Sequence, residues 1–143
     1  MRILGVSGSL RESSYNTGLL RAAAEAAPDG VELELWEGLA ELPLYDEELD
    51  GEHAPAAVQR LREAWGEADA ILFATPEYNG SVPGGLKNAI DWASRPVRAG
   101  ALNNKTVAVV GDCRSRASRR GRRVVRCWCG RSRRTPSRRA WCG

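Results

Sequence analysis

The chain has 143 residues and a formal net charge of +3, from 21 Lys+Arg and 18 Asp+Glu. This length suits one domain, and no apolar run is long enough to span a membrane. The chain also opens without the pattern of a signal peptide, so we expect a cytoplasmic protein.

The net charge conceals two unlike segments. Residues 1–111 hold 9 Lys+Arg and 17 Asp+Glu, a net charge of −8, whereas residues 112–143 hold 12 Arg and 1 Asp, a net charge of +11. We therefore expect two parts that meet at Gly111: a folded domain over residues 1–111 and an Arg/Cys-rich tail over residues 112–143. The tail contains every cysteine of the chain, namely Cys113, Cys127, Cys129 and Cys142.

Apolar runs alternate with segments of helical period along the first part, which predicts an α/β fold. Three runs are apolar on both faces and are expected to be central strands, whereas residues 31–36 alternate apolar and acidic side chains, as an edge strand does. The expected central strands are residues 2–6, 70–74 and 106–110. The expected helices are residues 16–27, a segment that includes residues 57–65, and residues 83–94.

The segment between the first expected strand and its helix, residues 7–17, is rich in hydroxyl groups and carries one arginine. A helix N-terminus offers unpaired N–H groups and the positive end of the helix dipole. Hydroxyls and a guanidinium at such a position predict a phosphate-binding site. The alternative is a plain capping sequence, in which Ser14 or Asn16 caps the helix. Arg11 favours the phosphate site, because capping does not need an arginine.

A second polar loop follows the strand expected over residues 70–74, in the stretch TPEYNGSVPGGLKNAIDW. We expect Ser81 to cap the next helix and Pro83 to lie in its first turn. Open α/β sheets bind ligands in loops of this kind, at the carboxyl ends of their strands. Glycines that allow close backbone approach, the Asn79 amide and the Tyr78 ring suit a planar heteroaromatic ligand. The alternative is an ordinary polar connection.

Three segments, GSLRESSYN, LPLYDEELD and PEYNGSVPGGLKNAIDW, resemble the NADPH-dependent FMN reductase family, which includes quinone, azo-dye and chromate reductases. The third segment is long and specific, and the resemblance runs from Met1 to about Gly111. It implies a flavodoxin-like parallel sheet in the order 2-1-3-4-5. It also implies a homodimer or homotetramer, in which the acidic loop over residues 37–53 borders the flavin site and the dimer contact. From its residues alone, that loop is a solvated acidic segment.

The resemblance implies FMN as cofactor and NADPH or NADH as co-substrate, with hydride passing through the flavin to a quinone, a free flavin or a similar small acceptor. The flavin does the chemistry, so we expect no catalytic side chain and no metal site. The single histidine, His53, lies in the acidic loop and is expected to face solvent. The family's flavin-binding pattern falls on Ser9, Arg11, Ser14, Tyr15 and Asn16 in the first loop, and on Pro76, Glu77, Tyr78, Asn79 and Gly80 in the second.

The tail has no helical or strand period beyond Val124 and Val125. Its bias toward Arg, Cys, Trp, Gly and Ser suits out-of-frame translation of a GC-rich gene, and its clustered arginines also suit a non-specific nucleic-acid arm. A metal site is disfavoured, because Cys127 and Cys129 lack the paired spacing of such sites, and disulfides are disfavoured in a reducing cytosol. We favour the frame shift.

A non-native tail implies that the family's fifth strand and last helix are missing or non-native here. The fourth strand would then keep a free edge, which invites association, and Ile3, Leu72 or Val109 would lack a covering helix. The family's third flavin loop is expected at residues 112–121, which do not match it. We therefore expect a marginal, aggregation-prone protein with weak or no reductase activity.

Two other functions remain open from the sequence. One is a non-enzymatic FMN binder or electron carrier on the same fold. The other is a basic module that binds polyanions through the tail. Salt-sensitive retention on DNA that is lost on deletion of residues 112–143 would indicate the basic module.

Overall fold

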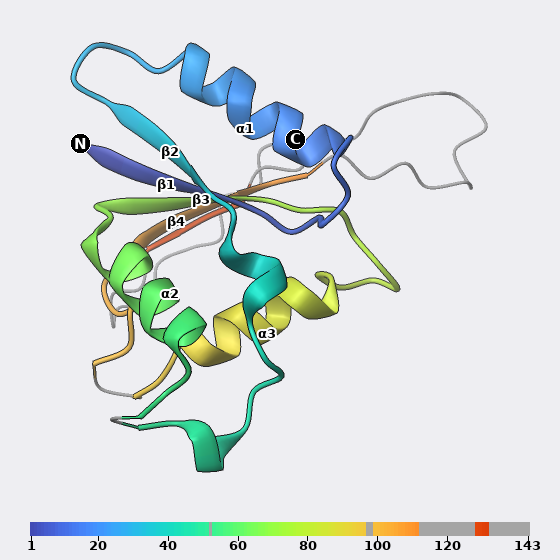
Figure 1. The fold of residues 1–143 in the computed structure, drawn as a ribbon. Coiled ribbons are helices and arrows are strands. Elements are labelled where there is room, and N and C mark those ends of the chain that lie inside the picture. Colours follow the sequence, from blue (N-terminus) through green and yellow to red (C-terminus); the bar gives the residue numbers. More distant parts are fainter. Residues whose placement is uncertain (52, 97–98, 112–127, 132–143) are drawn as a thin grey trace.

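The computed structural model describes residues 1–51, 53–96, 99–111 and 128–131, and strands alternate with helices along most of its length (Figure 1). Strands β3 and β4 match the sequence prediction residue for residue, and the other predicted elements differ by one or two residues at their ends. The strands are β1 (Arg2–Ser7), β2 (Glu32–Trp36), β3 (Ala70–Ala74), β4 (Thr106–Val110) and β5 (Trp128–Arg131). The helices are α1 (Tyr15–Glu25), α2 (Ala56–Glu67) and α3 (Gly84–Ala93), with short 3-10 turns η1 (Gly38–Glu41) and η2 (Glu47–Leu49) in the acidic loop.

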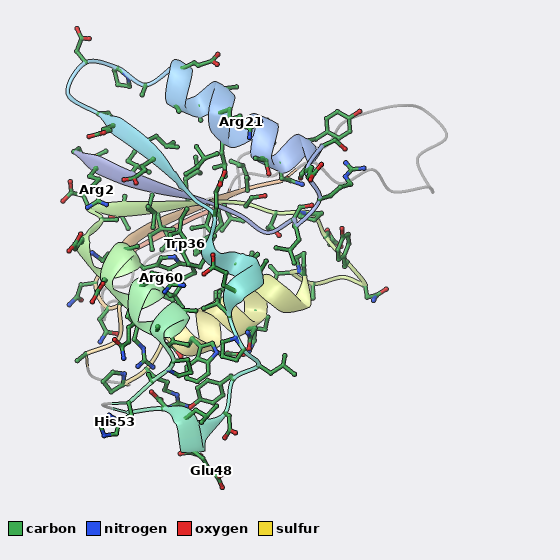
Figure 2. The ribbon with its side chains drawn as sticks, viewed as in Figure 1. Arg2, Arg21, Trp36, Glu48, His53 and Arg60 are labelled. Atoms are coloured by element: carbon green, nitrogen blue, oxygen red, sulfur yellow. The ribbon has the colours of Figure 1, made fainter. Side chains whose placement is uncertain are left out.

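The five strands form one sheet in the order β2-β1-β3-β4-β5. The first four run parallel, with Leu4 beside Ile71 and Phe73 beside Val109. The flavodoxin-like order is therefore confirmed, with β1 and β3 central and β2 at the edge. Arg2 begins β1 at the amino edge of the sheet, and Trp36 ends β2 near its carboxyl edge (Figure 2).

Strand β5 differs from the expected fold in its direction. It runs antiparallel to β4, with Trp128 opposite Val109 and Arg131 opposite Thr106. The expectation of a free β4 edge is therefore wrong, because ladder hydrogen bonds use main-chain groups and do not require an apolar side-chain pattern. Residues 112–127 and 132–143 lie outside the described residues, as do the side chains of β5. Four expectations rest on them: the third flavin loop, the cysteine chemistry, the polyanion-binding arm and the missing last helix.

The two helices that follow the candidate loops begin in different ways. The Ser14 hydroxyl accepts a hydrogen bond from the Asn16 N–H at 3.2 Å and caps α1, which is the role that the capping alternative gives it. The expectation that Ser81 caps α3 is wrong, because Pro83 is the N-cap and no side chain caps this helix. Ser81 lies two residues earlier, where its main chain is hydrogen-bonded to Tyr78.

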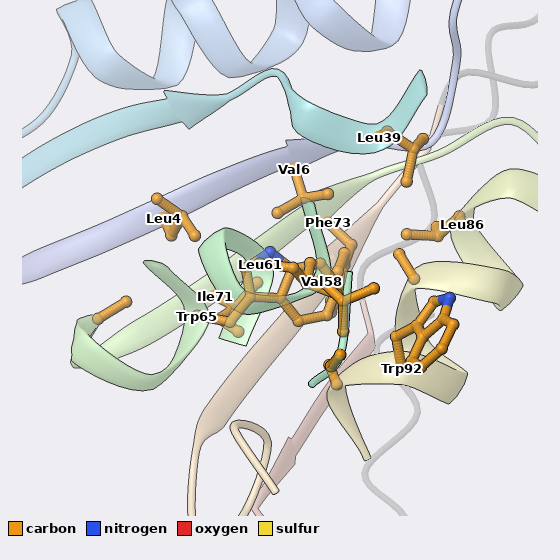
Figure 3. Close-up of a cluster of buried hydrophobic side chains, with 14 residues drawn as sticks. Leu4, Val6, Leu39, Val58, Leu61, Trp65, Ile71, Phe73, Leu86 and Trp92 are labelled. Carbon is orange, nitrogen blue, oxygen red and sulfur yellow. The ribbon is translucent and has the colours of Figure 1, made fainter. Parts of the chain in front are cut away.

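Helices cover the two faces of the sheet unequally. Helix α1 lies on one face, and α2 and α3 lie on the other (Figure 1). The main core fills the space between the sheet and the α2–α3 pair (Figure 3). Within it, Trp65 packs edge-on against Trp36 and Phe73, with ring centroids 5.8 and 5.3 Å apart. The buried core side chains are Leu4, Val6, Leu39, Ala54, Val58, Leu61, Trp65, Ala68, Ile71, Phe73, Leu86, Ala89, Trp92 and Ala93.

The α1 face is less fully covered. Leu20 of α1 is fully buried, whereas Ile3 and Leu72 of the sheet are only partly buried. The expectation that Val109 belongs with them is wrong. Val109 lies beside Phe73 and packs against the core under α2 and α3, because neighbours in parallel register share a face of the sheet.

Candidate functional site

The candidate site lies at the carboxyl edge of the sheet, between β1 and β3. The chain runs from β1 to β2 on one side and then returns to β3 on the other, so the connections after β1 and β3 leave in opposite directions. In open α/β sheets such a switch point leaves a crevice outside the strand ends, where ligands bind. Both predicted loops begin here, the first loop at residues 8–14 and the second loop at residues 75–83. The Gly8 N–H donates to the Ala74 carbonyl at 2.8 Å and joins them.

Hydroxyl groups hold the base of the first loop. The Thr17 hydroxyl donates to Ser7 Oγ at 2.9 Å, and the Ser7 hydroxyl donates to the Ser9 carbonyl at 3.3 Å. In return, the Ser9 N–H donates to Ser7 Oγ, also at 3.3 Å. Neither Ser7 nor Thr17 is among the residues predicted to bind the cofactor, although both lie in the hydroxyl-rich stretch that signals the site.

The predicted residues of the first loop divide into a buried pair and a more exposed group. Ser14 and Asn16 are 7% and 4% exposed. Arg11 and Tyr15 are exposed, with the guanidinium carbon 5.9 Å from the centre of the Tyr15 ring. Ser9 Oγ accepts a long hydrogen bond from the Arg11 N–H, at 3.5 Å. The structure therefore brings Ser9, Arg11 and Tyr15 together toward solvent and places the other two inside.

The exposed part of the first loop offers groups that suit an anion. Among the described residues, Arg11 makes no ion pair. Within the described residues, the N–H groups of Leu10, Glu12 and Ser13 also have no hydrogen-bond partner. A guanidinium and several free main-chain N–H groups beside a helix N-terminus form an arrangement that binds phosphate.

The second loop is built on a tight turn. Tyr78 and Ser81 exchange two main-chain hydrogen bonds of 2.8 and 3.0 Å around Asn79 and Gly80. These central residues have φ angles of 53° and 75°, the left-handed pattern of a type I′ turn, for which Asn-Gly is a favoured sequence. Within the described ranges, the N–H groups of Asn79 and Gly80 have no hydrogen-bond partner. The tip of the second loop therefore presents two free donors.

The predicted residues of the second loop are mostly exposed. Pro76 is buried, whereas Glu77, Tyr78, Asn79 and Gly80 are exposed, Tyr78 by 56%. They follow β3 at the same edge of the sheet at which the first loop follows β1. The structure therefore brings the exposed members of both predicted sets to one edge, on adjacent strands.

A third segment, the LPLY stretch of the acidic loop, is fastened to α3. Asn88 Oδ1 accepts from the Tyr45 N–H and its Nδ2 donates to the Pro43 carbonyl, both at 2.8 Å. Trp92 Nε1 donates to the same carbonyl at 2.9 Å, and the Trp92 and Tyr45 rings pack edge to face with centroids 4.9 Å apart. Leu44, between the two held residues, is 83% exposed. This part of the acidic loop is therefore more than a solvated segment.

Other charged groups lie away from the two loops. His53 is exposed, as expected, and lies on the far side of α2 from α1 (Figure 2). At the opposite edge of the sheet, a hydrogen bond to Glu67 and, second in size, one to Glu34 raise the pKa of Arg2. The described residues include no group of three His, Cys, Asp or Glu side chains placed to hold a metal ion. They also include no helix that is both long and apolar enough to cross a membrane.

Known proteins match this chain over most of its length. The family model for NADPH-dependent FMN reductases matches residues 1–127, which extends past Gly111. A quinone reductase of Pseudomonas putida is 50% identical over 105 residues, which are 73% of this chain and 56% of the relative. An NAD(P)H-dependent FMN reductase of Pseudomonas aeruginosa is 48% identical over 111 residues, which are 78% of this chain and 59% of the relative.

A solved structure also matches this chain. The flavoenzyme NAD(P)H:(acceptor) oxidoreductase from Paracoccus denitrificans has a TM-score of 0.70 and 39% identity, over 77% of this chain and 59% of that protein. This chain therefore spans a little over half the length of these relatives. The family match takes in strands β1 to β4 and both candidate loops, and the chain belongs to the NADPH-dependent FMN reductase family.

Proposed function

We propose that this chain is an oxidoreductase that holds FMN and passes hydride or electrons from NADPH or NADH through the flavin to quinones, free flavins or similar small acceptors. The observation that carries the proposal is the position of the two loops, which leave adjacent strand ends at the switch point of the sheet. Family membership supports it, as do relatives named FMN reductase and quinone reductase.

The first loop supplies the phosphate end of the proposed site. Arg11 contributes a full positive charge, and the N–H groups of Leu10, Glu12 and Ser13, which have no partner among the described residues, contribute donors beside the N-terminus of α1. The capping bond between Ser14 and the Asn16 N–H fixes the start of that helix. The proposed residues at this end are Ser9, Arg11, Ser14, Tyr15 and Asn16.

The second loop supplies the ring end. The N–H groups of Asn79 and Gly80, which have no partner among the described residues, would bind the polar edge of the isoalloxazine ring and stabilise negative charge there. Gly80 carries no side chain, so a planar ring can approach the main chain of the turn closely. FMN supplies the hydride-transfer chemistry when bound, and the protein binds and orients it. The proposed residues at this end are Pro76, Glu77, Tyr78, Asn79 and Gly80.

We assign flavin binding to residues 1–111 and regard residues 112–143 as an out-of-frame, non-native tail. The change of charge at Gly111 supports this division, as does the antiparallel direction of β5 beside four parallel strands. The family match that continues to residue 127 counts against a boundary at Gly111. We also propose that the protein is cytoplasmic and forms a homodimer or homotetramer.

Arg11→Ala tests the phosphate end of the site. We expect the affinity for FMN to fall by about tenfold or more, because a charge-assisted contact to phosphate is lost. The affinity for riboflavin, which has no phosphate, should not change. Arg21→Ala, which removes an exposed arginine of α1 (Figure 2), is the matched control. Quenching of flavin fluorescence by the full chain measures both affinities.

Two results of these titrations would contradict the proposal. An FMN affinity that Arg11→Ala does not change would place the phosphate elsewhere, and absence of any flavin binding by the unmodified chain would remove the proposed function. Oxidation of NADPH or NADH with a quinone by the FMN-loaded chain separates a reductase from a non-enzymatic FMN binder, which would show no turnover.

A further inference from the structure

Thr75 lies where three strand ends meet. It directly follows β3 and is 8% exposed. Its N–H donates to the Val110 carbonyl at the end of β4, at 2.9 Å, and its hydroxyl donates to the Pro76 carbonyl at 3.0 Å. Gly8, at the end of β1, is hydrogen-bonded to Ala74 beside it. Thr75 therefore connects the ends of β1, β3 and β4.

Two glycines lie so close to Thr75 that neither has room for a side chain. A Cβ added to Gly8 would lie 2.7 Å from the Thr75 Cβ and closer still to its hydroxyl oxygen. A Cβ added to Gly111, which follows β4, would meet the Thr75 carbonyl oxygen well inside van der Waals distance. By contrast, a Cβ at Gly18 in α1 would meet nothing within 4 Å. Packing this close transmits a shift at one strand end to the others.

We propose that Thr75 is a positioning residue that holds the first and second loops as one rigid unit, so that a displacement of the main chain in one loop alters flavin binding by the other. This inference rests on the proposed function and deepens it. The Thr75 side chain is the surface against which Gly8 packs, which fixes where the first loop begins. Its hydroxyl holds the buried Pro76 carbonyl, which fixes the direction in which the second loop leaves β3.

Gly8→Ala is the decisive variant, because the change lies in the first loop, whereas the expected effect is on binding of the isoalloxazine ring by the second loop. We expect its affinity for riboflavin, which has no phosphate, to fall by about tenfold, and its affinity for FMN to fall at least as much. Gly18→Ala is the matched control and should leave both affinities unchanged. Arg11→Ala should weaken FMN binding alone. Fluorescence quenching of both flavins by the full chain provides the comparison.

Hydrogen exchange of the flavin-free chain tests the same coupling without a ligand. We expect Gly8→Ala to speed exchange of the hydrogen-bonded N–H groups in both loops, namely Tyr78 and Ser81 in residues 76–81 and Ser9 and Arg11 in residues 9–13. Thr75→Val keeps the side-chain shape but loses the hydroxyl, so it should speed exchange in residues 76–81 alone. Thr75→Ala also loses the packing against Gly8 and should affect both segments, whereas Thr75→Ser keeps the hydroxyl and should rescue residues 76–81.

These measurements separate the inference from the proposed function. If the unmodified chain binds neither flavin, the proposed function fails, and the exchange data still decide the role of Thr75. If Gly8→Ala weakens FMN binding alone, or speeds exchange only in residues 9–13, the inference is overturned. If Gly8→Ala does not fold, Thr75→Ala decides: faster exchange in residues 9–13 supports the coupling, and unchanged exchange there overturns it.

Discussion

The two faces of the sheet are built from the same strands but are buried to different degrees. On the closed face, the side under α2 and α3, Leu4 and Ile71 are each 1% exposed (Figure 3). On the open face, the side under α1, Leu20 is fully buried but Ile3 and Leu72 are only partly buried. Each face nevertheless contributes a helix that begins beside a candidate loop. The comparison indicates that stability depends mainly on the closed face, whereas the candidate site draws on both.

The sequences of the helices explain the difference between the faces. Helices α2 and α3 contribute Trp65 and Trp92, which are both fully buried, whereas α1 is rich in alanine. Large side chains from two helices fill the space over the closed face, and one helix of small side chains covers less of the open face. The closed face also has an outer layer, because Asn88 fastens the LPLY stretch over α3.

The largest expected effect comes from Trp65→Ala, which breaks the closed face at its centre. Trp65 is fully buried between Trp36 and Phe73. Its removal leaves a large cavity and should lower the free energy of unfolding by about 3–5 kcal/mol. That loss approaches the whole stability of a small domain, so a large unfolded fraction is expected. Urea unfolding followed by far-UV circular dichroism measures the change.

Trp65→Phe is the matched variant, because it keeps an aromatic ring in the same place. The Trp65 Nε1 hydrogen has no hydrogen-bond partner in the described part of the chain, so its removal takes away an unpaired buried donor. We expect a loss of about 1–2 kcal/mol, well below that of the alanine variant. Equal losses in the two variants would show that filling the closed face with an aromatic ring is not what stabilises it.

Much of this fold follows from local sequence pattern. Strands β3 and β4 are predicted residue for residue, because each is a short apolar run with polar segments on both sides. The positions of the two candidate loops also follow from pattern, since stretches rich in hydroxyl groups, amides and glycine come directly after two of the predicted strands. Pattern thus locates the elements and the edge of the sheet at which both candidate loops begin.

Contacts between distant segments could not be predicted in this way. Asn88 lies in the middle of α3, where asparagine is a poor helix former, and that is a weak signal. Nothing in the local pattern indicates that its partners are Pro43 and Tyr45. Ser81 shows a second limit, because serine is favoured both at helix caps and in turns. Here the Asn-Gly turn uses its main chain, and the cap prediction fails.

A direct comparison of the two faces is available within β3. Ile71 and Leu72 are neighbours on the same strand, and one points to the closed face and the other to the open face. We expect Ile71→Ala to lower the free energy of unfolding by about 3–4 kcal/mol and Leu72→Ala by about 1–2 kcal/mol, because a partly buried side chain leaves a smaller cavity. Urea unfolding of both variants under identical conditions measures the difference. Equal losses would mean that the open face is covered as well as the closed one.

The last expected effect, smaller than that of Trp65→Ala or Ile71→Ala, concerns the outer layer of the closed face. Asn88→Ala removes the Asn88 hydrogen bonds to Pro43 and Tyr45 but leaves the one from Trp92 Nε1 to Pro43, and it should lower the free energy of unfolding by about 1–3 kcal/mol. Hydrogen exchange should accelerate at Tyr45 in particular, because Asn88 is the acceptor of its N–H. Leu44→Ser is the matched control, since Leu44 lies between the two held residues but is 83% exposed, and should change stability by less than about 0.5 kcal/mol.

If Asn88→Ala speeds exchange at Tyr45 without lowering stability, the LPLY stretch is held by α3 but does not strengthen the closed face. If Leu44→Ser is the more destabilising of the two variants, the exposed leucine secures this layer, and the claim that Asn88 fastens the LPLY stretch over α3 is wrong.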